Sequence, residues 1–201
     1  MAIASKKIGL YFGTFNPIHI GHLIIANHFA EYADIEEVWF IVTPKSPFKA
    51  KKSLLDNHHR FEMVYRATEK YPKLTPSRIE FKLPQPNYTI NTLIHLEEQY
   101  PDKAFSLIMG EDNLNSLHKW KNYDSILERY SIFVYPRITT LKIDKTLQDH
   151  PKIQRINAPI MEISSSFIRK AIKKGKVVRP LLPPEVWTYI DEMNFYKKTN
   201  G

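Results

Sequence analysis

The sequence predicts one α/β domain built on a doubly wound, mainly parallel sheet with helices on both faces. A short apolar run at 8–12 is followed by a turn rich in Gly and Pro, and then by apolar residues at helical spacing over 20–33. The next run, 37–43, is β-branched and aromatic, so the chain opens with a strand–helix–strand unit. Both runs are continuously apolar, which is typical of strands buried on both faces of a parallel sheet.

Length and composition agree with this class. The chain has 201 residues, of which 43% are hydrophobic and 25% charged, so we expect a single domain over 1–201, whose part from about 160 carries two further helices. No apolar run approaches the ~20 residues of a membrane span, and 1–7 lacks the apolar core of a secretory signal. We therefore expect a cytoplasmic protein with no membrane partner. The absence of cysteine excludes disulfides and thiolate metal sites, so any metal must be held by oxygen or imidazole ligands. Mg²⁺ carried by a nucleotide fits that limit, and we expect no other metal.

The chain carries a formal charge of +8, from 29 Lys and Arg against 21 Asp and Glu, which favours anionic partners. The basic residues form no long run, and no aromatic RNA-binding motif accompanies them. Polyphosphate substrates are therefore favoured over nucleic acid, and a basic surface without functional meaning is the alternative.

The segment 13–22, G-T-F-N-P-I-H-I-G-H, joins the first strand to the first helix. Gly13 permits a close backbone approach, and His19 and His22 are spaced to share one face of the first helical turn. Free backbone N–H groups at a helix start favour an anion, most naturally a phosphate. A single His there would more often be a surface or core residue, but the frame of Gly and Pro favours a phosphate site.

The next elements are expected in the following order. Residues 44–55 form a loop in which Lys45 and Lys49 either contact substrate phosphate or are merely solvated. Asp56 caps a helix whose apolar stripe faces the sheet. That stripe comprises Phe61, Val64, Tyr65 and Thr68. The neighbouring polar residues His58, His59 and Arg60 are expected to be exposed.

Residues 77–83 alternate apolar and polar side chains, which predicts a strand near a sheet edge. A helix follows from Thr89, which is expected to cap it, and Tyr88 ahead of it could place an aromatic ring against a planar base. The strand at 103–109 ends in Gly110, and Asp112 then either caps the next helix or binds a ribose hydroxyl. Trp120 is either a core or rim residue or a stacking partner.

The last third predicts a strand at 130–136, a variable connection with some helix at 139–152 and strand-like residues within 153–163. The sequence I-S-S-S-F-I-R over 163–169 then opens a helix in which Ser165 and Arg169 offer a second anion site. A plain serine-capped helix is the alternative. A terminal helix opens at Pro183–Pro184 and should dock through Val186, Trp187 and Ile190.

Four of these motifs resemble, in order, those of the bacterial nicotinate-nucleotide adenylyltransferase family of the nucleotidyltransferase superfamily. They are G-T-F-N-P-I-H-I-G-H, the Tyr88–Thr89 segment, G-E-D-N-L at 110–114, and I-S-S-S-F-I-R. The resemblance runs from Ile8 to about Tyr196. The first and last motifs occur across the superfamily, whereas the middle two are more particular to its pyridine nucleotide branch. The resemblance implies a Rossmann-like fold. It also implies transfer of AMP from ATP to nicotinate mononucleotide, which gives deamido-NAD and pyrophosphate.

The resemblance also implies roles for individual residues. His19, His22 and Arg169 would be catalytic. The ATP-binding residues would be Gly13, Thr14, Phe15, His19, His22, Gly110, Asp112, Ser165 and Arg169. The nicotinate mononucleotide-binding residues would be Asn16, Lys45, Lys49, Tyr88, Thr89 and Trp120. The implied cofactor is Mg²⁺ that arrives with ATP, with no tightly bound organic cofactor.

The chain departs from the family pattern at three places. Phe12–Gly13 stands where the family has paired glycines, and Asn16 stands where Asp is common. The usual P-P-H-K loop reads Ser46-Pro47-Phe48-Lys49, so the phosphate contact expected from its His could pass to Lys45 or Lys49.

Two other functions are compatible with these patterns. One is adenylyl or cytidylyl transfer to another phosphate acceptor, such as phosphopantetheine. The other is a basic nucleotide- or RNA-binding module that keeps the fold without activity. The sequence leaves open whether the protein forms a homo-oligomer.

Overall fold

The computed structural model describes residues 5–44, 54–138 and 145–198, and six strands in them form one sheet. The strands are β1 (Lys6–Gly13), β2 (Glu37–Val42), β3 (Leu74–Ser77), β4 (Lys103–Gly110), β5 (Ser131–Tyr135) and β6 (Ile153–Arg155). Their order in space is β3-β2-β1-β4-β5-β6, and every neighbouring pair is parallel. This confirms the doubly wound parallel sheet that the sequence predicts.

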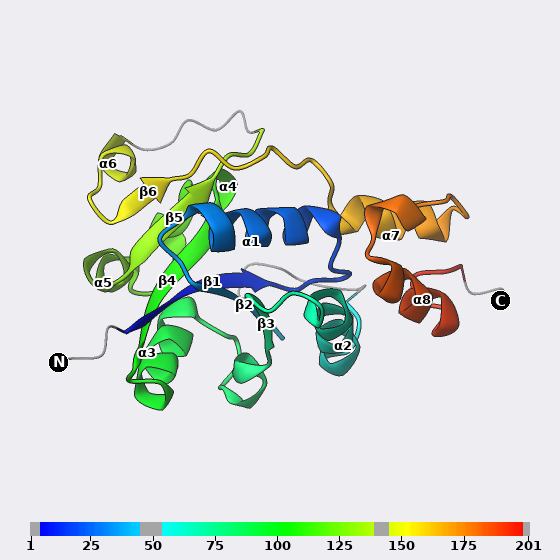
Figure 1. Cartoon of the computed structure of the whole chain (residues 1–201), viewed down its shortest axis with the longest axis horizontal. Coiled ribbons are helices and arrows are strands. Elements are labelled where there is room, and N and C mark those ends of the chain that lie inside the picture. Colours follow the sequence, from blue (N-terminus) through cyan, green and yellow to red (C-terminus); the bar gives the residue numbers. More distant parts are fainter. Residues whose placement is uncertain (1–4, 45–53, 139–144, 199–201) are drawn as a thin grey trace.

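Helices cover both faces of the sheet (Figure 1). The α-helices are α1 (Ile20–Tyr32), α2 (Asn57–Thr68), α3 (Thr89–Gln99), α4 (Glu111–Leu114), α5 (Tyr123–Arg129), α6 (Lys145–Gln148), α7 (Ser165–Lys173) and α8 (Pro184–Glu192). Short 3₁₀ helices are η1 (Ile79–Lys82), η2 (Leu117–Lys119) and η3 (Arg179–Leu181). Buried residues of α1, α2, α7 and α8 share one core, and those of α3 and α5 share the other. No helix in the described ranges has the length and apolarity to cross a membrane.

The winding of the sheet reverses direction at β1. The chain runs from β1 through α1 to β2 on one side, whereas β4 pairs with the opposite edge of β1 and leads into α4. Loops after β1 and β4 therefore leave toward opposite faces and open a crevice at the carboxyl ends of the strands, which is where ligands bind in such sheets. Gly13 and Gly110 are the last residues of these two strands.

The prediction of a strand over 77–83 is wrong in its position. The strand is β3, at 74–77, and it does form an edge of the sheet as expected, but 79–82 is the 3₁₀ helix η1. The alternation is misleading because Glu80, which counted as an outward polar residue, is only 1% exposed. Its Oε1 accepts a hydrogen bond of 2.6 Å from the Thr92 hydroxyl of α3.

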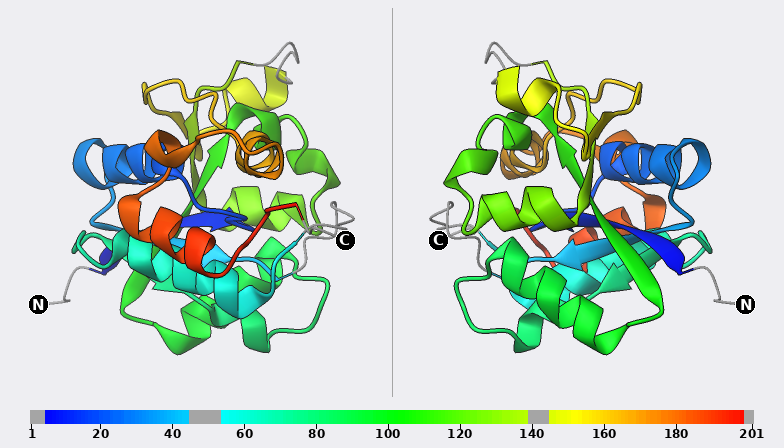
Figure 2. Two further views of the ribbon diagram at one scale, coloured as in Figure 1. Left: turned by 90° about the vertical axis from the view of Figure 1, so that its right-hand side faces the viewer. Right: turned by 90° about the vertical axis from the view of Figure 1, so that its left-hand side faces the viewer.

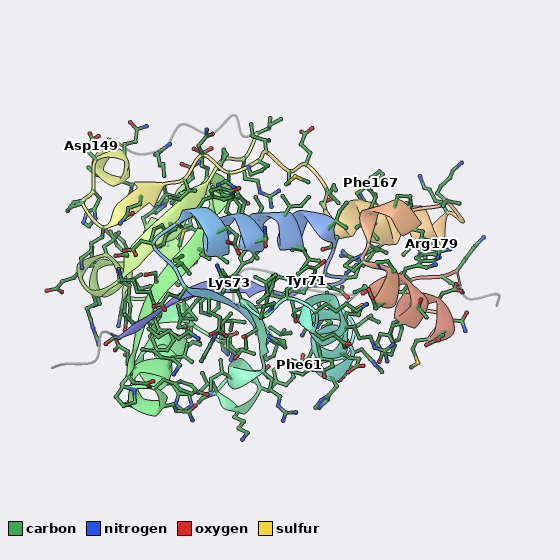
Figure 3. The ribbon with its side chains drawn as sticks, viewed as in Figure 1. Phe61, Tyr71, Lys73, Asp149, Phe167 and Arg179 are labelled. Atoms are coloured by element: carbon green, nitrogen blue, oxygen red, sulfur yellow. The ribbon has the colours of Figure 1, made fainter. Side chains whose placement is uncertain are left out.

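The capping of α2 by Asp56 is confirmed, since its carboxylate accepts from the backbone N–H of His58 at 2.8 Å. In the apolar stripe predicted for this helix, Val64 and Thr68 are buried and Phe61 is partly buried, as predicted, whereas the prediction is wrong for Tyr65. Tyr65 is 48% exposed. Phe61, which is labelled in Figure 3, packs edge-on against Phe81 of η1. The buried residues of α2 are Arg60, Met63, Val64, Ala67 and Thr68.

Arg60, which the sequence analysis places on the surface, has no exposed area at all. Its Nη1 donates to the carbonyl oxygens of Thr14 at 2.7 Å and Thr43 at 2.9 Å. Three weaker or more local bonds, to Pro44 O, Leu55 O and Asn57 Oδ1, complete its donor set. The side chain is buried because these loop carbonyls have no sheet partner and need a donor. Arg60 thus ties the segment after β1 to the segment after β2.

The remaining elements largely follow the prediction. Tyr88, and not Thr89, occupies the N-cap of α3, and Thr89 is its first helical residue. β6 is confined to 153–155, and α6 supplies the helix expected in the described part of 139–152. In α8, Val186 and Ile190 are fully buried and Trp187 is partly buried, as the docking prediction requires. Figure 2 shows α8 lying against α2.

Replacing Arg60 tests whether this buried guanidinium holds the two strand ends together. Arg60→Met should lower the free energy of unfolding by at least about 3 kcal/mol, because it leaves several buried carbonyls without a donor. Urea denaturation measures the change. The control is Arg66→Met on the same helix, which removes a surface ion pair to Glu62 and a cation–π contact with the Tyr189 ring. It should cost only about 1 kcal/mol. Equal losses in both variants would contradict the assigned role.

Candidate functional site

The loop from Gly13 to His19 folds its aromatic side chain inward. A Cβ atom on residue 13 would lie 2.7 Å from the Phe15 ring, so this position requires glycine. Phe15 has a φ of 43° and is 2% exposed, and its ring packs edge-on against His22 at 5.2 Å between centroids. The Phe15 side chain is therefore part of the core, and only its backbone is available to the ligand that the sequence analysis assigns to it.

His19 and His22 lie together at the start of α1, as their spacing predicts. His19 occupies the N-cap, and the two rings stack with centroids 3.7 Å apart. The backbone N–H of His19 donates to Nδ1 of His22 at 3.2 Å, so a neutral His22 carries its proton on Nε2. A Cβ on residue 21 would lie 3.1 Å from His19 Nδ1, which explains the glycine between the two imidazoles.

Both imidazoles are neutral at pH 7. Burial lowers the pKa of His19 to about 4, and the positive charge of Arg137 adds to the effect. Burial, the neighbouring His19 and Arg137 lower the pKa of His22 well below its usual value. His19 Nδ1 is buried and has no hydrogen-bond partner among the described residues. A polar ligand at this helix start would supply that partner.

The start of α7 docks on the same loop (Figure 1). The Ser165 hydroxyl donates to the Pro17 carbonyl at 2.8 Å, and Arg169 Nη1 donates to the Asn16 carbonyl at 2.7 Å. Ser164 caps the helix by accepting from the backbone N–H of Phe167 at 3.2 Å. The first and last sequence motifs are thus adjacent, and Ser165 and Arg169 hold the loop that carries the His pair.

Asn16 is only 3% exposed and lies among these loop contacts. Its Oδ1 accepts from the Tyr196 hydroxyl at 2.7 Å and from the backbone N–H of Leu55 at 3.4 Å. The structure therefore places Asn16 where three distant segments meet, and it does not line the cavity described below.

The end of β4 forms the other side of the crevice. Gly110 is the N-cap of α4, and a Cβ there would lie 2.5 Å from Asp112 Oδ1. Asp112 is exposed, and Arg137 Nε lies 3.8 Å from its carboxylate. Glu111 accepts from the Arg137 backbone N–H at 3.2 Å and from Arg155 Nη1 at 3.0 Å. The sequence analysis did not assign Arg137 to the site, although its place just after a strand was a signal.

A cavity of about 410 Å³ opens beside the carboxyl ends of β1 and β2, on the α3 side of the sheet. Gly13, Thr14, Tyr88, Thr89 and Trp120 line it, so five predicted ligand residues converge there. The other lining residues are not predicted from the sequence; they are Phe12, Thr43, Glu80, Asn87, Asn113, Ser116, Lys119 and Lys121. The predicted Lys45 and Lys49 lie outside the described residues.

The cavity combines aromatic walls with positive charge. Lys121 Nζ lies 4.8 Å from the centre of the Tyr88 ring, a cation–π distance, and Lys119 and Trp120 precede it in the chain. On the wall, burial raises the pKa of Glu80, while hydrogen bonds from Thr92 and Thr43 oppose the rise. A cavity of this kind suits a flat ring that carries a negative substituent.

Comparison with known proteins places this arrangement in a class. Residues 10–171 match the cytidylyltransferase-like family model. With the parallel sheet and the imidazole pair at the start of α1, this match defines a protein of the nucleotidyltransferase class.

Two relatives identify the family within this class. Over 193 residues the chain is 64% identical to a protein of Christiangramia forsetii named probable nicotinate-nucleotide adenylyltransferase, with 96% of this chain and 100% of that protein covered. A protein of the same name from Flavobacterium psychrophilum is 65% identical over 192 residues, with the same coverage. The chain therefore belongs to the nicotinate-nucleotide adenylyltransferase family.

Solved structures support the fold independently. The Plasmodium falciparum nicotinic acid mononucleotide adenylyltransferase complexed with NaAD aligns with a TM-score of 0.79 and 24% identity, over 95% of this chain and 97% of that chain. The structure of that enzyme complexed with APC gives a TM-score of 0.77.

The lowered pKa of His19 predicts a pH-dependent stability. Between the ordinary value of 6.5 and about 4, the unfolded chain binds a proton at this residue and the folded protein does not. Stability should therefore be complete above pH 6.5 and should fall as the pH drops toward 4. Urea unfolding measures the free energy of unfolding across this range. Between pH 6.5 and 4 that free energy should fall further in the native protein than in His19→Gln, by on the order of 2 to 3 kcal/mol. Parallel pH profiles for the two proteins would contradict the buried neutral state.

Proposed function

We propose that this protein transfers the adenylyl group of ATP to nicotinate mononucleotide and releases deamido-NAD and pyrophosphate, a reaction of NAD biosynthesis that we expect to take place in the cytoplasm. The observation that carries the proposal is the position of two sites around one strand end. The neutral His pair lies on the α1 side of the loop after β1, and the aromatic cavity lies on its α3 side. Family membership supports the same activity.

The ATP phosphates are proposed to bind at the start of α1, where backbone N–H groups and the helix dipole favour an anion. His22 Nε2–H donates to the α-phosphoryl oxygens, and His19 supplies a second neutral donor. Arg169 donates from Nη1 to the Asn16 carbonyl and from Nη2 to the Ser166 hydroxyl, and these are two of the five N–H donors of a guanidinium group. Because the Ser165 hydroxyl donates to the Pro17 carbonyl, the backbone N–H of Ser165 and the remaining N–H groups of Arg169 are proposed to bind the outer phosphates. Gly110 and Asp112 are proposed to bind the adenosine.

Nicotinate mononucleotide is proposed to occupy the cavity. Trp120 and Tyr88 flank its ring, and the ring carboxylate lies toward the start of α3 at Thr89, where unpaired N–H groups and the nearby Lys121 favour negative charge. Nicotinamide lacks that charge, so this arrangement favours nicotinate. The interior position of Asn16 suggests that it shapes the loop and does not contact the ring.

The reaction is a direct displacement. An oxygen of the mononucleotide 5′-phosphate forms a bond to the α-phosphorus as the bond from that phosphorus to the bridging oxygen of pyrophosphate breaks. The attacking phosphate is already ionised at neutral pH, so neither a general base nor an enzyme nucleophile is needed. Catalysis then comes from positioning and from stabilising charge on the transferred group, which suits a site of His, Ser and Arg.

Magnesium is proposed to arrive with ATP. The described residues contain no group of three or more His, Asp or Glu side chains that could hold a metal ion. A Mg²⁺ ion bound by the phosphates themselves keeps several waters and needs few protein ligands, so the residues present are compatible with it. When bound, it neutralises charge on the leaving pyrophosphate.

Acceptor choice tests the proposed function. Pyrophosphate release from Mg-ATP should be fast with nicotinate mononucleotide, and much slower with nicotinamide mononucleotide or phosphopantetheine. Preference for phosphopantetheine would keep the phosphate site and overturn the assignment of the cavity. No turnover with any acceptor, together with salt-dependent RNA binding, would favour the non-catalytic module.

His22 should supply a large part of the rate. His22→Ala should lower kcat, because the transition state loses about 2 to 4 kcal/mol of stabilisation when one oxyanion donor is removed. The fold should persist. Steady-state kinetics and thermal unfolding measure the two effects. His28→Ala is the matched control, since His28 lies on the same helix against Tyr32 and away from the loop. Near-normal turnover of His22→Ala would exclude this role.

A further inference from the structure

The C-terminal segment reaches the loop that carries the His pair, although 180 residues separate Tyr196 from Asn16. The Tyr196 hydroxyl donates to Asn16 Oδ1 at 2.7 Å. Neither the sequence motifs nor the substrate sites assign a role to Tyr196. Through this hydrogen bond, the C-terminal segment contacts the loop directly ahead of His19.

The backbone after α8 is shaped to make this contact. Asn194 and Tyr196 both adopt left-handed conformations, with φ of 55° and 63°. Non-glycine residues seldom keep such angles unless surrounding contacts fix them. The backbone N–H of Phe195 donates to the Ile190 carbonyl at 3.0 Å, and its ring packs on His59 of α2 at 4.8 Å. The segment is therefore anchored on α2 before it turns toward the loop.

Asn16 lies in the part of the loop where several hydrogen bonds from distant segments meet. Its carbonyl accepts from Arg169, the next carbonyl, of Pro17, accepts from Ser165, and Arg60 bonds the Thr14 carbonyl two residues earlier. These three bonds fix the backbone, but none of them fixes the Asn16 amide. The hydroxyl of Tyr196 and the N–H of Leu55 do, because both donate to Oδ1.

The hydroxyl remains a donor under all ordinary conditions. Burial raises the pKa of Tyr196 above its usual range, and the neighbouring Arg169 and Arg60 only partly oppose the rise. The same two guanidinium groups donate to the loop carbonyls of Thr14 and Asn16, so the Tyr196 hydroxyl is near both of the arginines that hold the loop.

We propose that Tyr196 is a positioning residue for the phosphate-binding loop, which acts through Asn16 to hold His19 and His22 in their stacked arrangement. Its role in turnover rests on the proposed function. The C-terminal segment then contributes to catalysis by positioning the loop, although the segment itself contacts no substrate.

The test compares two variants that each remove one hydroxyl from the C-terminal region. Tyr196→Phe removes the bond to Asn16. Tyr189→Phe removes the 2.9 Å bond between the Tyr189 hydroxyl and His59 Nδ1, which ties the same region to α2 without reaching the loop. We expect Tyr196→Phe to lower kcat about fivefold to tenfold with the KM for nicotinate mononucleotide within twofold of the native value. Tyr189→Phe should leave kcat within twofold, even if both lower the Tm equally.

A second readout does not depend on activity. The ring proton signals of His19 and His22 in the NMR spectrum should move in Tyr196→Phe and stay in place in Tyr189→Phe. In an Asn16→Ala background, Tyr196→Phe should move them no further, because the acceptor is already gone.

Equal kcat values for the two variants, or His signals that respond to both or to neither, would overturn the positioning role. If the native protein forms no product from nicotinate mononucleotide, the proposed function fails. The NMR comparison then decides the positioning role by itself.

Discussion

The pairing of β1 with β2 on one side and with β4 on the other is the constraint on which the rest of the molecule depends. It brings the last residues of three parallel strands to one edge of the sheet and sends the chain to opposite faces from β1 and β4. Segments far apart in sequence must then run side by side across that edge. Their backbone groups have left the sheet ladder, and burying them without partners would be costly.

Buried cationic and hydroxyl donors meet this need. Arg60 serves the carbonyls after β1 and β2, while Arg169 and Ser165 serve those of Asn16 and Pro17. A third guanidinium acts on the imidazoles themselves. Burial lowers the pKa of both His19 and His22, and the positive charge of Arg137, whose Nη1 donates to the Met161 carbonyl, lowers it further. Bound polyphosphate would oppose that effect, so the ligand and the protonation of the pair are linked.

The sequence predicts those parts of the structure that depend on local patterns. Continuous apolar runs located β1, β2, β4 and β5, and the Gly- and Pro-framed loop located the paired imidazoles. It could not predict the side chains whose environment is built by distant segments. Arg60 and Glu80 read as surface residues because their partners at Thr14, Thr43 and Thr92 come from other elements. The family resemblance implies that Phe15 binds ATP, and no local pattern shows that the close approach at Gly13 lets its ring pack into the core.

The two-sided arrangement around Gly13 and Thr14 suits displacement at phosphorus. The attacking and leaving oxygens must lie on opposite sides of the phosphorus atom, so the two substrates have to approach it from different directions. His22 packs with Phe15 and Tyr11 on the α1 face, and His19 stacks on His22. Phe12 and Trp120 pack against the core on the α3 face. Gly13 and Thr14 lie between them, where a side chain larger than hydrogen at Gly13 would collide with Phe15. The glycine therefore does more than permit a turn, because it lets the core pack beneath the point at which the two substrates are proposed to meet.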